Sequence, residues 1–169
     1  MCIRDSGTAN VLNSCIGLDD LRCFISVTTD KVYANKEKLR AFQETDPLGG
    51  DDPYSASKAC AELVTKSYFN SFFKGKLNIA TARAGNVIGG GDWSKNRLIP
   101  DLVRSAESKE PIYIRFPNAT RPWQHVLEPL IGYLLLAEKL YTEEKKEECE
   151  AWNFGPDKKQ VGKVIEISR

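Results

Sequence analysis

The chain has 169 residues, of which 41% are hydrophobic and 28% charged, a composition that indicates a folded domain and excludes a wholly disordered chain. Its 24 basic and 23 acidic side chains leave a formal charge of +1, which argues against nucleic acid or an anionic membrane as the main partner. The longest strongly apolar stretch, Leu130 to Leu136, is far shorter than the roughly 20 residues that cross a bilayer, so we expect a cytoplasmic protein without a membrane partner.

The first half of the sequence alternates predicted strands and helices. The β-branched run CFISVT predicts a buried strand over 23–28, and LNIATAR predicts a second over 77–83. Between them Asp52 is placed to cap a helix that begins at Pro53 and continues to about Phe73. Its expected apolar face consists of Ala61, Val64, Tyr68 and Phe72.

The second half continues the alternation with shorter elements. We expect loops over 86–96 and 117–124, helices over 98–106 and 126–141, strands over 111–115 and 151–154, and the start of a helix at Gln160. The apolar face of the long helix is assigned to Leu127, Leu130, Leu134 and Ala137. The charge run from Glu143 to Glu150 predicts a solvated helix end and turn. This order is typical of an α/β fold with a doubly wound parallel sheet.

Two motifs in the first half carry chemistry. Tyr54 and Lys58 lie four residues apart and share one helix face, where an ammonium next to a phenol stabilises the phenolate and makes the tyrosine a general base for an alcohol or sugar hydroxyl. A surface tyrosine and a solvated lysine are the alternative interpretation of this short pattern. The run Thr28-Thr29-Asp30-Lys31 directly follows the first strand, at the edge where open α/β sheets bind ligands, and turn chemistry is its alternative.

Taken in order, these motifs resemble the extended short-chain dehydrogenase/reductases, and within them the nucleotide-sugar 4,6-dehydratases. The segments that carry the resemblance are TTDKVYANKE, DPLGGDDPYSASKACAELV, RAGNVIGGGDW, RLIPDLVR and ATRPWQHVLEPLIGYLLLAE. Thymidine-linked members have a glutamate after the aspartate, whereas Lys31 resembles the cytidine-linked branch. The resemblance therefore implies a partial Rossmann-like sheet, NAD as cofactor, and CDP-glucose as the substrate of a lyase (a hydro-lyase) in deoxysugar and lipopolysaccharide O-antigen biosynthesis.

The resemblance also assigns roles to individual residues. Tyr54 would take the proton of the sugar 4-hydroxyl, with Lys58 on the nicotinamide ribose and Thr29 on the same sugar oxygen. Asp30 would act as acid towards the 6-hydroxyl, which requires its protonated form, and Lys31 as base at C5, which requires its neutral form. The cofactor-binding set is Thr28, Tyr54, Lys58 and Arg83; the substrate-binding set is Asn86, Gly89, Gly90, Arg97, Arg115, Arg121 and His125.

The glycines, two of the arginines and the histidine of the substrate-binding set have plain alternatives. Glycines let backbone amides approach phosphate closely, but three consecutive glycines also make a flexible loop. Arg115 and Arg121 suit a diphosphate, or are solvated arginines. His125 is a ligand contact, or a helix-start histidine packed beside Trp123, and both Trp123 and Trp93 are expected to pack near the substrate. Five scattered cysteines without a CxxC pair, and His125 as the single histidine, predict free thiols and no metal site.

The sequence departs from the family pattern at its beginning. No GxxGxxG turn precedes the first strand, so we expect the central and later part of a longer enzyme. The expected organisation is an unrelated leader over 1–6, the later part of the NAD-binding domain with the catalytic residues over 7–85, and a mixed substrate-binding lobe with the last Rossmann elements, truncated, over 86–169. An inactive fragment and a related nucleotide-sugar epimerase or reductase are the alternatives. The resemblance further implies a homodimer of the longer protein, packed through the helix that carries Tyr54.

Overall fold

The computed structural model describes residues 3–34, 40–144, 149–157 and 162–167. The chain divides into two compact units, and each is described by itself. Unit 1 comprises Met1–Ala84 and Leu130–Phe154, and unit 2 comprises Gly85–Pro129 and Gly155–Arg169. The functions expected for 1–6, 7–85 and 86–169 stay predictions.

Unit 1 is built on a parallel sheet. Among the described residues, the strands β1 (Cys23–Val27), β2 (Asn78–Ala84) and β6 (Glu150–Phe154) pair in the order β1-β2-β6. Parallel neighbours need a crossover connection, and helices supply it on both sides of β2. The three strands lie where the sequence predicts them, and the fold class is confirmed as α/β with a parallel sheet.

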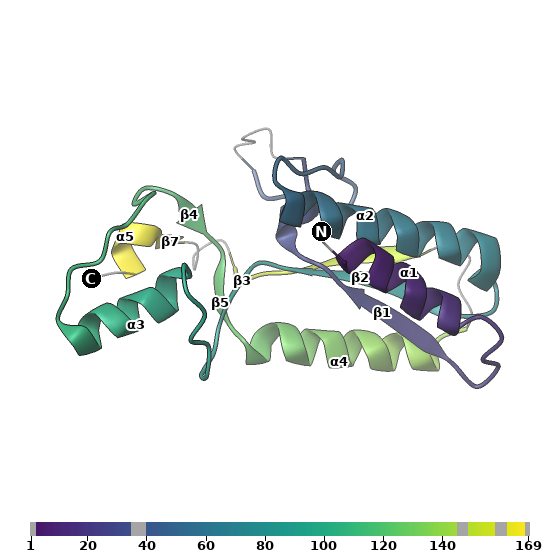
Figure 1. Cartoon of the computed structure of the whole chain (residues 1–169). Helices are drawn as coiled ribbons and strands as arrows, with labels where there is room; N and C mark the ends of the chain where they lie inside the picture. Colours follow the sequence, from purple (N-terminus) through teal and green to yellow (C-terminus); the bar gives the residue numbers. More distant parts are fainter. Residues whose placement is uncertain (1–2, 35–39, 145–148, 158–161, 168–169) are drawn as a thin grey trace. The chain divides into compact units, whose positions relative to one another are not determined.

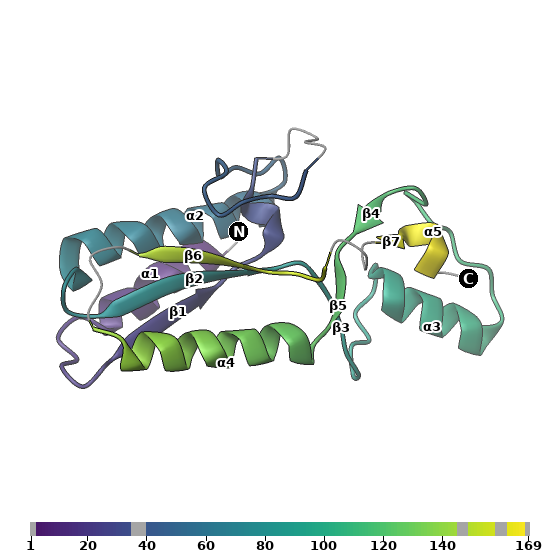
Figure 2. The same cartoon turned by 180° about the vertical axis from the view of Figure 1, so that it is seen from behind.

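Helices cover both faces of this sheet. The helices α1 (Arg4–Ser14) and α2 (Pro53–Tyr68) lie side by side on one face, and α4 (Leu127–Thr142) lies on the other (Figures 1 and 2). A π-helical turn over Phe69–Phe73 extends α2, as the predicted helix end requires. The predicted position of α4 is also confirmed.

The core of unit 1 is divided between the two faces of the sheet. On the side of α1 and α2 it is formed by Leu12, Phe69, Phe73, Leu77 and Ile79. On the side of α4 it is formed by Ala80, Ala82, Leu136 and Leu140. The predicted face of α4 was therefore wrong, because Leu127, Leu130 and Leu134 are exposed while Leu136 and Leu140 pack on β2.

The predicted face of α2 was correct only in part. Ala61 is buried and Val64 packs against the core, but Phe72 is exposed. Most of the buried positions of α2 are small or polar: Ser55, Ser57, Ala59, Ala61, Glu62 and Thr65. This helix therefore approaches the sheet closely, and its polar side chains require internal partners.

Unit 2 consists of short elements. They are β3 (Asn86–Ile88), α3 (Leu98–Ser108), β4 (Thr120–Arg121), β5 (Trp123–His125), β7 (Gly162–Lys163) and α5 (Val164–Ile167). β3 pairs with β5 in parallel, and β4 with β7 in antiparallel.

Several expectations for the second half of the chain were wrong. The strand expected over 111–115 is absent from this described segment, and the expected loops over 86–96 and 117–124 contain β3, β4 and β5. These strands of two or three residues are too short to carry a hydrophobic period. The helix expected over 98–106 is confirmed, whereas the start expected at Gln160 lies outside the described residues.

Within the described residues, no helix is both long and apolar enough to cross a membrane.

Candidate active site

The motif after β1 folds into a tight turn. Thr29 precedes a 3₁₀ turn over Asp30–Val32, and its Oγ1 accepts a bond from the Lys31 amide at 3.4 Å. The same hydroxyl donates to Asp30 Oδ1 at 3.1 Å. Thr28 and Thr29 are both buried, and the turn itself holds the Thr29 hydroxyl through Asp30 and Lys31.

The first turn of α2 is fixed by its cap. Asp52 Oδ1 accepts bonds from the amides of Tyr54 at 2.9 Å and Ser55 at 3.0 Å, and the Ser55 hydroxyl donates to Oδ2 at 2.5 Å. The bonds from Ser55 are the largest cause that lowers the pKa of Asp52 below 3.8. This is the predicted cap, and it holds the backbone that carries Tyr54.

A glycine allows the preceding segment to approach this turn. A Cβ at Gly50 would lie 2.6 Å from the backbone nitrogen of Ala56 and 2.6 Å from the carbonyl carbon of Ser55. Neither backbone atom can move without shifting the helix, so this close approach requires glycine.

The structure brings the two predicted motifs together. The Lys58 ammonium donates to the carbonyl oxygen of Val27 at 3.0 Å, one residue before the TTDK motif. Lys31 Nζ lies 5.8 Å from the ring centroid of Tyr54, and Arg4 lies over the same ring at 4.7 Å. The ring of Tyr54 therefore has two cationic neighbours. Tyr54 is also 37% exposed, so its side chain remains open to a ligand.

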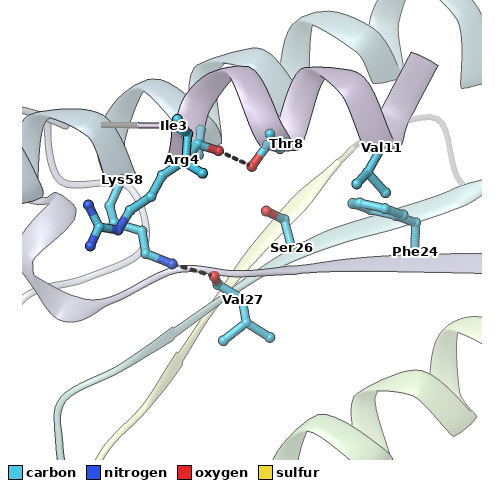
Figure 3. Close-up of a pocket in the computed structure, with 10 residues that line it drawn as sticks. Ile3, Arg4, Thr8, Val11, Phe24, Ser26, Val27 and Lys58 are labelled. Carbon is cyan, nitrogen blue, oxygen red and sulfur yellow. Dashed lines mark hydrogen bonds between the residues drawn. The ribbon is translucent and has the colours of Figure 1, made fainter. Parts of the chain in front are cut away.

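A cavity of about 390 Å³ lies between α1, β1 and α2, next to Lys58 (Figure 3). Ser26 and Thr8 contribute hydroxyls, and Phe24 and Val11 contribute apolar surface. The Lys58 side chain spans one wall and ends at Val27. The volume of the cavity falls within the usual range of small-molecule sites, about 300–1,000 Å³.

Arg83 lies in a buried network that the sequence did not reveal. Its Nε donates to Glu62 Oε1 at 2.7 Å, and its Nη2 donates to Glu62 Oε2. Its Nη1 donates to the Tyr33 hydroxyl at 2.8 Å and to the carbonyl oxygen of Glu44 at 3.0 Å. Burial alone would lower the pKa of Arg83, but its bonds to Glu62 and Tyr33 hold that pKa above its usual value. The predicted contact of Arg83 with the cofactor stays a prediction.

Three of the predicted substrate-binding residues lie along β3 and the turn after it. Asn86 begins β3 and pairs with Trp123. A Cβ at Gly89 would lie 2.9 Å from Val126 Cγ1, so close packing within unit 2 already calls for glycine there. Gly90 has open space around it. The structure thus gives a packing reason for Gly89, and the roles of Asn86 and Gly90 stay predictions.

The predicted arginines and histidine of unit 2 lie at its surface. Arg97 forms an ion pair with Asp92 at 2.9 Å, and the Arg121 guanidinium donates to the carbonyl of Thr120. Arg115 is exposed. His125 Nδ1 accepts a bond from the Leu127 amide at 3.2 Å, which places it at the start of α4.

Two further observations concern predicted packing and metal binding. Trp93 is 58% exposed, contrary to the expected packing, whereas Trp123 is half-buried. Over the parts of the chain that are described, no three His, Cys, Asp or Glu residues are grouped so that they could hold a metal ion.

Comparison with known proteins gives this geometry a context. The profile of the NAD dependent epimerase/dehydratase family matches residues 4–155. The CDP-glucose 4,6-dehydratase of Salmonella typhimurium is 47% identical over 167 residues, which cover 95% of this chain and 46% of that enzyme. A trifunctional UDP-glucose 4,6-dehydratase of Arabidopsis thaliana is 34% identical over 110 residues, covering 64% of this chain and 16% of that protein.

Solved structures share the fold. UDP-glucuronic acid 4-epimerase from Bacillus cereus, in complex with UDP-glucuronic acid and NAD, matches with a TM-score of 0.82 at 21% identity over 97% of this chain and 48% of that one. A double mutant of dTDP-glucose 4,6-dehydratase from Streptomyces venezuelae, with NAD bound, matches with a TM-score of 0.77 at 23% identity over 96% of this chain and 46% of that one. The chain therefore spans less than half the length of these proteins.

Proposed function

The chain belongs to the NAD dependent epimerase/dehydratase family, and from that premise we propose that the protein carrying it converts CDP-glucose to CDP-4-keto-6-deoxyglucose. The observation that carries the proposal is the 47% identity to CDP-glucose 4,6-dehydratase across 95% of the chain. The approach of Lys31 to Tyr54 supports it, because a base at C5 and a base at the 4-hydroxyl must serve adjacent carbons of one sugar. The activity is proposed for the whole gene product, because the 169-residue chain covers only 46% of the length of this relative.

The overall reaction balances as the loss of one water. The hydroxyl at C4 is oxidised to a ketone, and the hydroxymethyl carbon C6 is reduced to a methyl group. These two changes cancel, so no external oxidant is consumed. A bound nicotinamide cofactor would supply the hydride acceptor for the oxidation at C4 in its oxidised form, and the hydride donor for the reduction at C6 in its reduced form.

The residues beside the cavity fit a ribose-bearing cofactor. Lys58 places an ammonium at the cavity wall, and Ser26 and Thr8 place hydroxyls there, which suits ribose hydroxyls. Phe24 and Val11 offer apolar surface to a ring. We assign Lys58 to the nicotinamide ribose, and Thr28 and Arg83 stay in the predicted cofactor-binding set.

Tyr54 is the proposed base of the first step. Its phenolate oxygen takes the proton of the sugar 4-hydroxyl as the C4–H bond breaks. Thr29 is proposed to bond the same sugar oxygen. The turn already fixes the Thr29 hydroxyl through Asp30 and Lys31.

Asp30 and Lys31 are the proposed pair for elimination. The ketone at C4 acidifies the proton on C5, which Lys31 in its neutral form removes. Asp30 in its protonated form gives a proton to the 6-oxygen, the C6–O bond breaks, and water leaves. The ammonium formed on Lys31 returns a proton to C5 when C6 is reduced, so Lys31 ends neutral as it began. Asp30 ends as a carboxylate and Tyr54 as a phenol, and exchange of one proton with solvent at each residue restores the starting state.

Unit 2 supplies the proposed contacts to the substrate. Arg97, Arg115 and Arg121 carry the positive charge that a diphosphate needs, and Asn86 and His125 carry hydrogen-bonding groups. Gly90 has space for a phosphate oxygen near its backbone.

We also propose a cytoplasmic homodimer that packs through α1 and α2. Exposed apolar side chains support it: Leu63 on α2 and Phe72 on the π-helical turn that extends α2. Sedimentation of the complete gene product at the mass of a monomer would exclude the dimer without touching the catalytic proposal.

The test of the reaction is direct. The purified gene product is incubated with NAD⁺ and CDP-glucose, with UDP-glucose and dTDP-glucose in parallel, and the sugar nucleotides are analysed by mass spectrometry. Loss of one water from CDP-glucose, faster than from the other two, is the expected result. An unchanged mass with a changed sugar stereochemistry would identify an epimerase. No conversion by the gene product would reject the proposal, and the 169-residue chain assayed alone shows whether it is inactive by itself.

A further inference from the structure

The helix that carries Tyr54 is tied to the end of β1 by side chains at successive turns. Lys58 and Glu62 follow Tyr54 at four-residue intervals and share its helix face. Lys58 donates to the Val27 carbonyl at 3.0 Å, and the Thr28 hydroxyl donates to Glu62 Oε1 at 2.6 Å. Two turns of α2 are thus bonded to Val27, the last residue of β1, and to Thr28, which follows it and immediately precedes Thr29. Together these bonds set the position of α2 along β1.

The Glu62 carboxylate is held from several directions at once. Oε1 accepts from Thr28 and from Arg83 Nε, and Oε2 accepts from Thr81 at 3.1 Å and from Arg83 Nη2. Four donors therefore address the roughly four lone-pair sites of one carboxylate. Glu62 and Arg83 are each 4% exposed. A carboxylate held in this way has one orientation available to it.

Arg83 is fixed in turn by groups on other elements. The Tyr33 hydroxyl accepts from Arg83 at 2.8 Å and donates to Asn153 Oδ1 on β6 at 2.6 Å. The ring of Tyr33 stacks on Phe42 with centroids 4.7 Å apart. We call Thr28, Glu62, Thr81 and Arg83 the Glu62 network. It joins α2 to β2 and to the residue that follows β1, and Tyr33 links it to Asn153 on β6.

Stability alone is a weak reason for this arrangement. Apolar residues of similar volume often replace a buried ion pair without loss of stability, because desolvation offsets most of the Coulomb attraction. A bidentate guanidinium–carboxylate pair does supply a defined geometry. The geometry defined here is that of the junction between the two catalytic motifs.

We propose that Glu62, held by Arg83, is a positioning residue that keeps the Tyr54 helix aligned with the Thr29-Asp30-Lys31 turn. This inference rests on the proposed function. A helix rises 1.5 Å per residue, so even a fraction of a residue's slip along β1 would move the Tyr54 hydroxyl relative to Thr29. Misplacement of a reacting group by about 1 Å costs on the order of 100-fold in rate.

Two matched substitutions separate positioning from mere packing. Thr28→Val and Thr81→Val each remove a buried hydroxyl bonded to the Glu62 carboxylate, but only Thr28 precedes the catalytic turn. In the complete gene product, we expect Thr28→Val to lower kcat by about 10-fold with an unchanged KM for CDP-glucose, and Thr81→Val to stay within about 2-fold. Equal losses in the two variants would overturn the proposal. A loss in Thr28→Val that appears wholly as weaker NAD⁺ binding would also overturn it.

Hydrogen exchange at a backbone amide of the turn tests the positioning role without substrate, and so independently of the proposed reaction. The Val32 amide donates to the carbonyl oxygen of Thr29 at 3.3 Å, within the turn that the network is proposed to hold. We expect hydrogen exchange at this amide to accelerate in Thr28→Val and not in Thr81→Val. Unchanged exchange in both variants would contradict the positioning role, whatever substrate the protein uses.

The central carboxylate can be tested by graded substitution. Glu62→Gln keeps the shape but offers Arg83 an amide, so we expect a larger fall in kcat than for Thr28→Val, about 100-fold. Glu62→Asp keeps the charge and should recover part of that loss. If both variants fold, as circular dichroism reports, and both retain full kcat, the proposal fails; if Glu62→Gln does not fold, the two threonine variants decide.

Discussion

Lys31 Nζ lies 5.8 Å from the centroid of the Tyr54 ring, although one residue comes from the turn after β1 and the other from the first turn of α2. This relationship places the two side chains that we propose as bases next to each other at the carboxyl end of a parallel sheet, where open α/β folds bind their ligands. In the proposed reaction one side chain serves the oxygen on C4 and the other serves the hydrogen on C5. The proposed reaction therefore requires two bases close together, as Tyr54 and Lys31 are.

Removing the Tyr54 hydroxyl tests the proposed base. We expect Tyr54→Phe to lower kcat by about 100- to 10,000-fold, because proton removal from the 4-hydroxyl loses its acceptor. The ring and its cationic neighbours remain, so the fold and NAD⁺ binding should change little. Steady-state kinetics and calorimetric titration with NAD⁺ measure the two effects, and Tyr68→Phe on the same helix is the control. Activity near that of the control would exclude Tyr54 as the base.

The cap of α2 predicts a pH dependence of stability. The pKa of Asp52 is lowered below 3.8 in the folded chain, first by its bonds from Ser55. Its contribution to stability is therefore fully present above pH 3.8 and is lost as the pH falls through the lower, folded pKa. Asp52→Asn retains a capping side chain without this titration.

The urea midpoints of the wild type and Asp52→Asn, measured from neutral pH to below pH 3.8, check this prediction. We expect the advantage of the wild type to shrink as the pH falls. The same substitution at the neighbouring Asp51 is the control. A difference between wild type and Asp52→Asn that is constant across this range would contradict the role of the Asp52 charge.

Gly50 predicts a local steric requirement beside Tyr54. A Cβ there would lie 2.6 Å from backbone atoms of Ser55 and Ala56, so Gly50→Ala should destabilise the fold by about 1–3 kcal/mol through overpacking. Gly155→Ala, where nothing lies within 4 Å of the added carbon, should stay within about 0.5 kcal/mol of the wild type. Chemical denaturation measures both variants. Equal stability of the two would show that the close approach at Gly50 is not maintained in solution.

The elements that the sequence predicts well are those whose signal lies in neighbouring residues. The strand at Cys23–Val27 and the capped start at Asp52 were placed correctly, because both signals depend on adjacent residues. The expected burial of β1 was wrong in part, since only Ser26 is buried and Val27 is 48% exposed. The continuous apolar run of α4 was placed correctly but given the wrong face. Leucines occur on every side of this helix, so periodicity could not select Leu136 and Leu140.

The Glu62 network could not have been predicted from local patterns. A glutamate in the middle of a helix is normally a solvated residue, and only its buried partners distinguish Glu62. Of those partners, Thr28 follows β1 and Arg83 lies on β2, and they meet Glu62 only when the sheet and α2 assemble. The four-residue interval from Lys58 to Glu62 was the one local signal, since it places both residues on the face that carries Tyr54.

The most direct test of the central claim follows one hydrogen through the reaction. CDP-glucose with deuterium on C4 is converted by the complete gene product with NAD⁺, and the product is examined by mass spectrometry and NMR. We predict a product lighter by one water, with the deuterium in the methyl group at C6, because the hydride taken from C4 returns within the same molecule. Deuterium that stays on C4, or a sugar nucleotide of unchanged composition, would contradict the proposal that this chain carries the catalytic residues of a 4,6-dehydratase.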